Sequence, residues 1–555
     1  MDLSSFPAVV GRVTIASAPE GLDAFALARL ARERGRVLHV ARDDARLAAL
    51  ARTIAFIDPA LHVLAWDCLP YDRVSPNGEI LSRRVETLAE LSAMDTGDGP
   101  LVVLTTVNAV LQRVPPRRYF EGSSLTLKVG QEMPLDDLLA VFTRSGYGRT
   151  DTVREPGEYA VRGGIVDVYP TGMDEPVRLD FFGDELEAAR PFDAMTQRTS
   201  GSLDRVVFRP VGETLLDDQS IHRFRTGYRA LFGAEVASDP VYEAVSAGHR
   251  HGGMEHWLPL FHDGMATLLD YVGEVAVTLD HQVDEAATAR FDQIAEYYDA
   301  RRQMLRAGGA ESGGIYRPLP ADALYLGPDE WTALLADRPV GAITPFAAPP
   351  GDAVIDLGAA GGIDFAEART RGGSAVYDAA RDAIAAEVTA GRRVVVAGYS
   401  EGSRDRLASL LRDHGVEPIE PVDSMAAAEG LPAATVAAAV LPLERGWRHE
   451  NLTVIAEPDL VGERMARPSS RRRRRGEEFL QEVGALEAGD YVVHAEHGIG
   501  QYLGLDTLEI GGAPHDCLRL VYAGGDKLFV PVENIEVLSR YGSEDSNAQL
   551  DKLGG

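Results

Sequence analysis

A serine in a glycine-flanked turn has the spacing expected of a covalent catalyst. Gly398-Tyr-Ser-Glu-Gly402 is a G-x-S-x-G sequence between an apolar run and a helical stretch, the setting of a hydrolase nucleophile. His414 and His449 follow as candidate partners, but no glycine motif for an oxyanion hole precedes the strand. Serine also caps helices at such junctions. We therefore expect Ser400 to be a helix cap and assign no catalytic residue to the chain.

Four histidines surround one acid and raise the question of a metal site. They are His249, His251, His256 and His262, with Glu255 among them. The spacing differs from H-E-x-x-H, in which two histidines lie one helical turn apart on the same face. We expect no metal here.

The stretch Thr14–Leu30 has the strand, loop and helix order of a phosphate-binding loop. Such a loop needs glycine N–H groups, a lysine for the β/γ-phosphates and a Ser or Thr for Mg²⁺. Ser17-Ala-Pro-Glu-Gly21 and Asp23 supply a proline and two carboxylates, and the first lysine of the chain is Lys128. We therefore expect no ATP at this loop and no cofactor in this chain.

Strands and helices alternate around that loop. The apolar runs Arg12–Ala16 and Val37–Ala41 flank a helical stretch, Asp23–Arg34, so they form a βαβ unit with parallel strands. Further strands are expected at Leu61–Ala65 and Leu101–Thr105. This order predicts a parallel sheet like that of a nucleotide-binding helicase domain.

Two later regions also have α/β patterns. Helical periodicity returns between residues 210 and 338, notably at Ala286–Leu305. A second small α/β domain is then expected from its strands and helices: Ala353–Leu357, Tyr377–Thr389, Arg393–Ala397, Gly402–His414 and Leu452–Ala456.

From about Ser123 the strands become shorter, which predicts an α+β insert. Arg162 precedes a Gly-Gly pair that lets another backbone approach. Arg178 and Phe182 are four residues apart on an expected strand and share one face. Two arginines with an exposed aromatic have the composition of an interface hot spot, although core packing or salt bridges would explain the same residues.

The end of the chain has short alternating strands separated by glycines. Gly498 and Gly500 permit a turn with positive φ. The alternating apolar positions are Tyr491, Val493, Leu518, Leu520, Tyr522, Leu528 and Val530. This pattern predicts a small SH3/Tudor-like β-barrel with outer edges available to another strand.

Composition favours protein partners over nucleic acid. The 85 acidic and 55 basic residues give a net charge of −30, so most of the surface repels DNA. The two cysteines lack disulfide or zinc spacing, no signal peptide is apparent, and no apolar run approaches the ~20 residues of a membrane span. We expect a soluble, cytoplasmic protein without membrane contact. The run Arg471–Arg475 marks an exposed linker, either a phosphate-binding tether or a solvated segment.

Several segments together resemble one family. Trp66–Asp72 and Ile80–Arg84 resemble the repair helicase UvrB, and more closely the bacterial transcription-repair coupling factors, whose UvrB-like module has lost its ATPase site. Glu155–Pro170 is similar to the UvrA-docking domain of both families. Asp490–Leu505 resembles the RNA-polymerase-interacting module of CarD proteins and coupling factors. The chain is identified as an N-terminal portion of a coupling-factor family member.

The resemblance implies an α/β multidomain organisation. Its expected segments are UvrB-like domain 1a at 1–122, UvrB-like domain 2 at 123–209, domain 1b at 210–338, a degenerate α/β domain at 339–460, an Arg-rich linker at 461–485, a CarD-like domain at 486–545 and the start of a translocase region at 546–555.

The resemblance also implies partners and sites. In the family, positions matching Arg162, Arg178 and Phe182 dock UvrA. Leu508 falls on the strand that pairs with the polymerase β subunit, and Glu509 and Ile510 continue that edge. The implied function is recruitment of UvrA to stalled RNA polymerase in transcription-coupled nucleotide excision repair.

The motor of the full-length family, with its ATP, Mg²⁺ and most DNA contacts, would lie beyond this chain, which we expect to be monomeric. Two alternatives stay open: a UvrB-type ATP-dependent helicase, and a free-standing CarD-like transcription regulator. The missing P-loop lysine argues against the helicase.

Overall fold

The computed structural model describes residues 3–8, 10–58, 61–65, 78–94, 99–121, 123–233, 236, 239–251, 254–306, 317–371, 374–462, 491–494, 498–510, 513–531 and 538–540. The chain divides into two compact units, one of 1–303 with 317–463 and one of 304–316 with 464–555. Trp66–Asp72, Arg471–Arg475 and the segment 546–555, which carried sequence predictions, lie outside the described residues.

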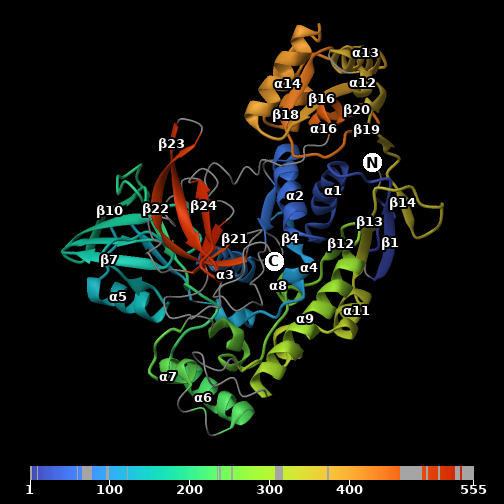
Figure 1. The fold of residues 1–555 in the computed structure, drawn as a ribbon. Coiled ribbons are helices and arrows are strands. Elements are labelled where there is room, and N and C mark those ends of the chain that lie inside the picture. Colours follow the sequence, from blue (N-terminus) through green and yellow to red (C-terminus); the bar gives the residue numbers. More distant parts are fainter. Residues whose placement is uncertain are drawn as a thin grey trace. The chain divides into compact units, whose positions relative to one another are not determined.

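A seven-stranded sheet organises the first unit, and all of its pairings are parallel, as predicted (Figure 1). In sheet order its strands are β14 (Val354–Asp356), β1 (Gly11–Ala16), β13 (Pro339–Ile343), β12 (Ala276–Leu279), β2 (Arg36–Ala41), β4 (Leu101–Thr106) and β3 (His62–Ala65). Val102 and Leu104 of β4 join one core, whereas Leu101 and Val103 join another. Every residue of β4 is buried because both faces of the sheet are covered.

Strands from distant parts of the chain separate the first two strands of this sheet. β1 and β2 are parallel, but β13 and β12 lie between them. The segment 353–357, which we expected in the second α/β domain, instead forms β14 and pairs with β1. The predicted domain boundary between residues 338 and 339 therefore falls within this sheet, because β13 and β14 both follow it in the sequence. Strand pairing between distant segments is not encoded in local sequence patterns.

Helices cover the faces of this sheet and fill the region between residues 210 and 338. Those before residue 120 are α1 (Leu22–Arg34), α2 (Asp44–Ile57), α3 (Gly78–Ala93), α4 (Val107–Val110) and η1 (Arg117–Tyr119). Those of the later region are α6 (Asp218–Phe232), α7 (Pro240–Ser246), η3 (Met254–Leu260), α8 (Leu268–Val272), α9 (Val283–Arg306), α10 (Ala321–Leu324) and α11 (Pro328–Ala336). The helix predicted at 286–305 is confirmed as α9. No described helix is both long enough and apolar enough to cross a membrane.

Residues 125–208 form the expected α+β insert. Its main sheet has the order β10 (Glu185–Pro191), β9 (Val177–Phe182), β8 (Ile165–Val168), β7 (Glu158–Arg162) and β6 (Gly148–Arg149). β5 (Leu125–Lys128) pairs with β11 (Arg205–Phe208), and α5 (Leu135–Arg144) lies beneath the main sheet (Figure 1). Leu138 and Phe142 of α5 pack with Val166 and Leu179, so the inner face of the sheet is apolar and its outer face is left for polar residues.

A polar joint attaches this insert to α3. The backbone N–H of Gly172 donates to Ser82 Oγ over 2.9 Å. Arg209 places its Nη1 3.9 Å from Glu86 Oε1 and its Nη2 3.5 Å from Glu90 Oε1. Burial raises the pKa of Glu86 to about 7, because a neutral carboxyl is less costly to desolvate than a carboxylate.

The second α/β domain has a six-stranded mixed sheet. In sheet order its strands are β15 (Ala360–Gly361), β19 (Trp447–His449), β20 (Leu452–Ala456), β16 (Arg393–Gly398), β18 (Val436–Val440) and β17 (Ile419–Pro421). Its helices are α12 (Ala366–Arg371), α13 (Ala375–Thr389), α14 (Glu401–Asp413), α15 (Met425–Gly430) and α16 (Glu457–Val461). β16, β17, β18 and β20 are parallel, which is the arrangement expected of an α/β domain.

The second unit contains a five-stranded antiparallel sheet. In sheet order its strands are β24 (Lys527–Pro531), β23 (Ala513–Val521), β22 (Gly498–Ile510), β21 (Tyr491–His494) and β25 (Leu538–Arg540). Leu518 lies opposite Val530 and Leu520 opposite Leu528, which confirms the predicted alternation. Over its described residues no pairing joins β24 to β25, so the closed barrel stays a prediction.

The predicted role of Gly500 as a turn residue is wrong. Gly500 lies inside β22 and pairs with Val492 of β21. A Cβ at this position would lie 3.0 Å from the ring of the buried Tyr522. The position therefore suits glycine because the tyrosine ring occupies the space of a side chain.

Candidate functional site

The outer face of the insert sheet brings the three predicted residues together. Val177 and Leu179 of β9 are buried, so the alternate residues Arg178 and Phe182 point outward, as predicted. Phe182 leaves 76% of its surface exposed. Arg162 ends β7, and β8 lies between the two strands that carry the predicted residues.

A buried carboxylate on β8 links the two arginines. Asp167 is directly opposite Arg178 in the sheet register. Arg178 donates from Nε to Asp167 Oδ1 over 2.7 Å and from Nη2 to Oδ2 over 2.9 Å. Arg162 Nη1 lies 3.7 Å from the same Oδ2. Hydrogen bonding to Asp167 raises the pKa of Arg178, so the guanidinium stays charged.

Aromatic packing holds Arg178 from its other side. Its guanidinium carbon is 5.0 Å from the ring centroid of Phe192, a cation–π distance. Phe192 is fully buried and packs with Val153 and Ala160 in a small cluster. Arg162 has a further contact of its own, in which its Nη2 donates to the backbone oxygen of Asp151 over 2.7 Å. The arginines therefore have defined positions before any partner arrives.

The sequence did not identify two further parts of this face, which are Ile165 and the ion pair between Asp180 and Arg190. Ile165 of β8 is 39% exposed and lies opposite Asp180, the outward residue of β9 between Arg178 and Phe182. Asp180 itself pairs with Arg190 of β10. The alternation within Ile165-Val-Asp167 could have shown that Ile165 and Asp167 share a face, but their cross-strand partners depend on the sheet register.

The Gly-Gly pair after Arg162 accommodates the next strand, as the sequence suggested. Gly163 has φ +65°, a conformation that L side chains rarely adopt. A Cβ at Gly164 would lie 2.7 Å from the backbone oxygen of Phe181, whose N–H donates to Gly164 O over 2.8 Å. The glycines therefore let β9 approach closely where it carries Phe182.

The second predicted site lies on β22. Leu508, Glu509 and Ile510 pair through their backbones with His515, Pro514 and Ala513 of β23. On the other edge of β22, the described pairings run from Gly498 to Gln501, which are opposite β21. Within the described part of this unit, residues 502–510 are therefore paired along one edge only, which is the property a strand needs to accept another strand.

The loop at the place of a P-loop is filled by groups of the chain itself. Asp23 Oδ1 accepts the backbone N–H groups of Gly21 over 2.9 Å and Ala24 over 2.7 Å. Asp23 also forms a buried ion pair with Arg46, whose Nε is 3.3 Å from Asp280 Oδ2. A carboxylate thus binds donors at the start of α1, where a nucleotide would place a phosphate.

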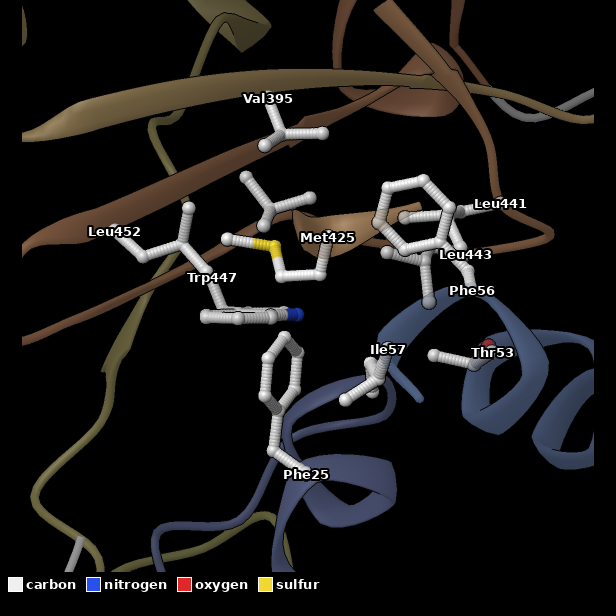
Figure 2. A pocket seen from close by; sticks show the side chains of 12 residues that line it. Phe25, Thr53, Phe56, Ile57, Val395, Met425, Leu441, Leu443, Trp447 and Leu452 are labelled. Atoms are coloured by element: carbon white, nitrogen blue, oxygen red, sulfur yellow. The ribbon is translucent and has the colours of Figure 1, made fainter. Parts of the chain in front are cut away.

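Side chains of the second α/β domain cover the same loop. A Cβ at Gly21 would lie 2.8 Å from Leu443 Cδ2 and 2.9 Å from Trp447 Nε1. Figure 2 shows the Trp447 indole facing the ring of Phe25, and the two centroids are 5.8 Å apart with the rings edge to face. Both rings line a small hollow whose other lining residues are apolar except for Thr53. That the loop does not take ATP stays a prediction.

The candidate nucleophile Ser400 and His262 of the histidine cluster both have hydrogen-bond partners within the chain. Ser400 is the N-cap of α14, and its side chain accepts the N–H of Ser403, as predicted. His262 contacts the backbone oxygen of Glu213 through Nε2 at 2.7 Å, and burial lowers its pKa. Among the described residues, no group of three His, Cys, Asp or Glu side chains is placed to hold a metal ion.

Models of known families match three segments of the chain. Residues 125–213 match the model of the UvrB interaction domain, residues 388–460 the MFD D3 domain, and residues 486–542 the CarD-like/TRCF RID domain. The outer-face residues described above lie in the first match, and Leu508–Ile510 lie in the third.

Curated relatives match along nearly the whole chain. The transcription-repair-coupling factor of Escherichia coli is 34% identical over 539 residues, which are 94% of this chain and 44% of that protein. Those of Haemophilus influenzae and Myxococcus xanthus are 30% and 29% identical and cover 96% and 94% of this chain. The chain spans less than half the length of these relatives. With these matches and three of its domains in order, the chain belongs to the transcription-repair-coupling factor family.

Proposed function

We propose that this chain recruits repair proteins to stalled RNA polymerase through two separate docks. The outer face of the insert, defined by Arg162, Asp167, Arg178 and Phe182, binds UvrA. The open edge of β22 at 502–510 binds the polymerase β subunit. The observation that carries the proposal is the exposed Phe182 beside two fixed arginines, within a region that matches the UvrB interaction domain.

The UvrA dock has the physical features of an interface hot spot. Phe182 is largely exposed and gains most from burial by a partner. The arginines are charged and already ordered, so binding them costs little conformational entropy. Phe182 and Ile165 both expose apolar surface on this sheet face, and a partner that covers the face would bury it.

The polymerase dock uses backbone groups. An unpaired strand edge presents alternating N–H and C=O groups, and a partner strand can satisfy them by extending the sheet. Leu508 would then supply side-chain specificity in the middle of that edge. This binding mode depends little on net charge, which suits a chain of net charge −30.

A crossed binding experiment tests the two docks. Purified UvrA and purified polymerase β subunit are each titrated against the wild-type chain, Phe182→Ala and Leu508→Arg. We expect Phe182→Ala to weaken UvrA binding alone and Leu508→Arg to weaken β-subunit binding alone. Gln501→Arg is the matched control for Leu508, because it lies on β22 where both edges are paired. Loss of both partners in one variant, or of neither in both, would contradict the two-dock arrangement.

The remaining helicase alternative requires nucleotide at the Ser17–Gly21 loop. The contacts of Asp23, Leu443 and Trp447 with that loop argue against it. Equilibrium titration with a fluorescent ATP analogue separates the helicase alternative from the proposed recruitment function, because a helicase must bind the analogue.

A further inference from the structure

We propose that Asp167 is the positioning residue of the UvrA dock: it sets both arginines in the geometry that the partner recognises without contacting the partner itself. This inference rests on the dock proposed above. It assigns a function to a buried residue whose type alone would suggest an ordinary core salt bridge.

Burial excludes Asp167 from direct contact. Its residue surface is 2% exposed, whereas the side chains of Arg178 and Arg162 are 22% and 53% exposed. A partner lying on this face would reach the guanidinium groups first. Asp167 therefore acts through them.

The bidentate contact fixes the orientation of Arg178. Two parallel N–H···O bonds hold the plane of the guanidinium, and the ring of Phe192 limits its movement. This contact uses Nε and Nη2, so it engages two of the five N–H donors and leaves others for an incoming acceptor. The planar geometry then favours a partner carboxylate, which can also pair with two N–H groups.

One acid shared by two arginines leaves this cluster with a net positive charge. Asp167 neutralises one of the two charges of Arg162 and Arg178. The next outward pair, Asp180 with Arg190, is balanced. Glu185 of β10 lies opposite Phe182 and places a carboxylate at that end of the face, so the surplus positive charge belongs to the arginine end of the dock, beside the exposed Ile165. Its complement is a carboxylate next to an apolar recess.

The direction in which Asp167→Asn changes the affinity for UvrA separates a positioning role from simple charge attraction. Asp167→Asn removes a negative charge, so a partner attracted by positive charge alone would bind more tightly. If Asp167 positions the arginines, the same substitution loosens the Arg178 fork, and binding weakens. We expect the Kd for purified UvrA to rise about tenfold, as for a hot-spot residue.

The test uses calorimetry with UvrA and the full 555-residue chain. Asp167→Asn is measured alone and in a background that carries both Arg162→Ala and Arg178→Ala, where a residue that acts only through the two arginines should change Kd less than about twofold. Asp239→Asn is the matched control, since it replaces a buried acid that pairs with an arginine outside the insert, and it should change Kd less than about twofold. Thermal unfolding of every variant is recorded alongside.

Arg178→Lys serves as a second test if Asp167→Asn does not fold. Lysine keeps the charge but cannot form the fork, so we expect about a tenfold loss of affinity, and unchanged affinity would overturn the inference. Unchanged or tighter binding by Asp167→Asn, with Phe182→Ala still weakened, would overturn the positioning role and leave the dock in place. If Phe182→Ala, Arg178→Ala and Asp167→Asn all bind like wild type, the proposed dock itself is misplaced.

Discussion

Replacing Phe182 by alanine removes the most exposed large apolar side chain described on this protein. A phenylalanine carries roughly 150–250 Å² of surface. With 76% of it exposed, docking can bury on the order of 150 Å². At ~25 cal/mol per Å² this corresponds to an upper value of roughly 3–4 kcal/mol, which the ordering of the interface reduces. We expect a loss of about 2 kcal/mol, or a roughly 30-fold increase in Kd for UvrA.

The same substitution should leave the fold almost unchanged. Phe182 contributes little to the core because most of its surface already contacts water. The free energy of unfolding should therefore change by less than about 0.5 kcal/mol. Isothermal titration calorimetry measures the affinity, and urea unfolding measures the stability.

Phe346→Ala is the matched control for this prediction. Phe346 is 63% exposed and lies after β13 of the first sheet, outside the insert, so the chemical change is the same at another location. Its substitution should leave UvrA affinity at the wild-type value. Wild-type affinity in Phe182→Ala would refute the reasoning, as would equal losses in both variants, which would show a non-specific apolar effect.

Four other predictions follow from the contacts described. ATP analogues should show no saturable binding to the chain in equilibrium titrations, and micromolar affinity that is lost on mutating Ser17–Gly21 would contradict this. Asp23→Ala should lower the free energy of unfolding by about 3–4 kcal/mol, because it leaves Arg46 buried with a weaker partner and frees two N–H groups; a change below ~1 kcal/mol in urea unfolding would refute that account. The pKa of Glu86 is raised to about 7 in the folded protein, so its protonated carboxyl favours the folded state. This stabilisation is fully present below the ordinary pKa of a glutamate and is lost as the pH rises through about 7. Glu86→Gln should therefore gain stability over wild type, on the order of 1–2 kcal/mol after solvent screening, between pH 5 and pH 8, and a flat difference across that range would exclude this titration. Leu508→Arg should reduce affinity for the polymerase β subunit at least about tenfold with an unchanged far-UV circular dichroism spectrum, and loss of that spectrum would show that Leu508 belongs to the core.

Local patterns in the sequence identified the elements and several site residues. The strands at 12–16, 37–41 and 101–105 and the helix at 286–305 follow from apolar periodicity, which depends on near neighbours in the chain. Arg178 and Phe182 share an outward face because residues four apart on a strand always do. The missing lysine and the carboxylates of the loop before α1 also needed no structure, since residue type alone decides that chemistry.

Contacts between distant segments were decided only by the tertiary structure. β12 and β13 enter between β1 and β2, although more than 200 residues separate them from the first strand. Gly500 lies within β22, where Tyr522, on another segment, fills the space that a side chain would need. Neither arrangement follows from local periodicity.

The site shows the same division. The sequence by itself determined which side chains could dock a partner: two arginines and an aromatic on short strands. The fold decided that Asp167 joins the arginines and that Ile165 flanks Phe182, because cross-strand neighbours depend on the register of β7, β8 and β9. It also decided that Leu443 and Trp447 cover the loop before α1, which more than 400 residues of chain separate from them. Such contacts depend on how distant segments pack, so only the folded chain could reveal them.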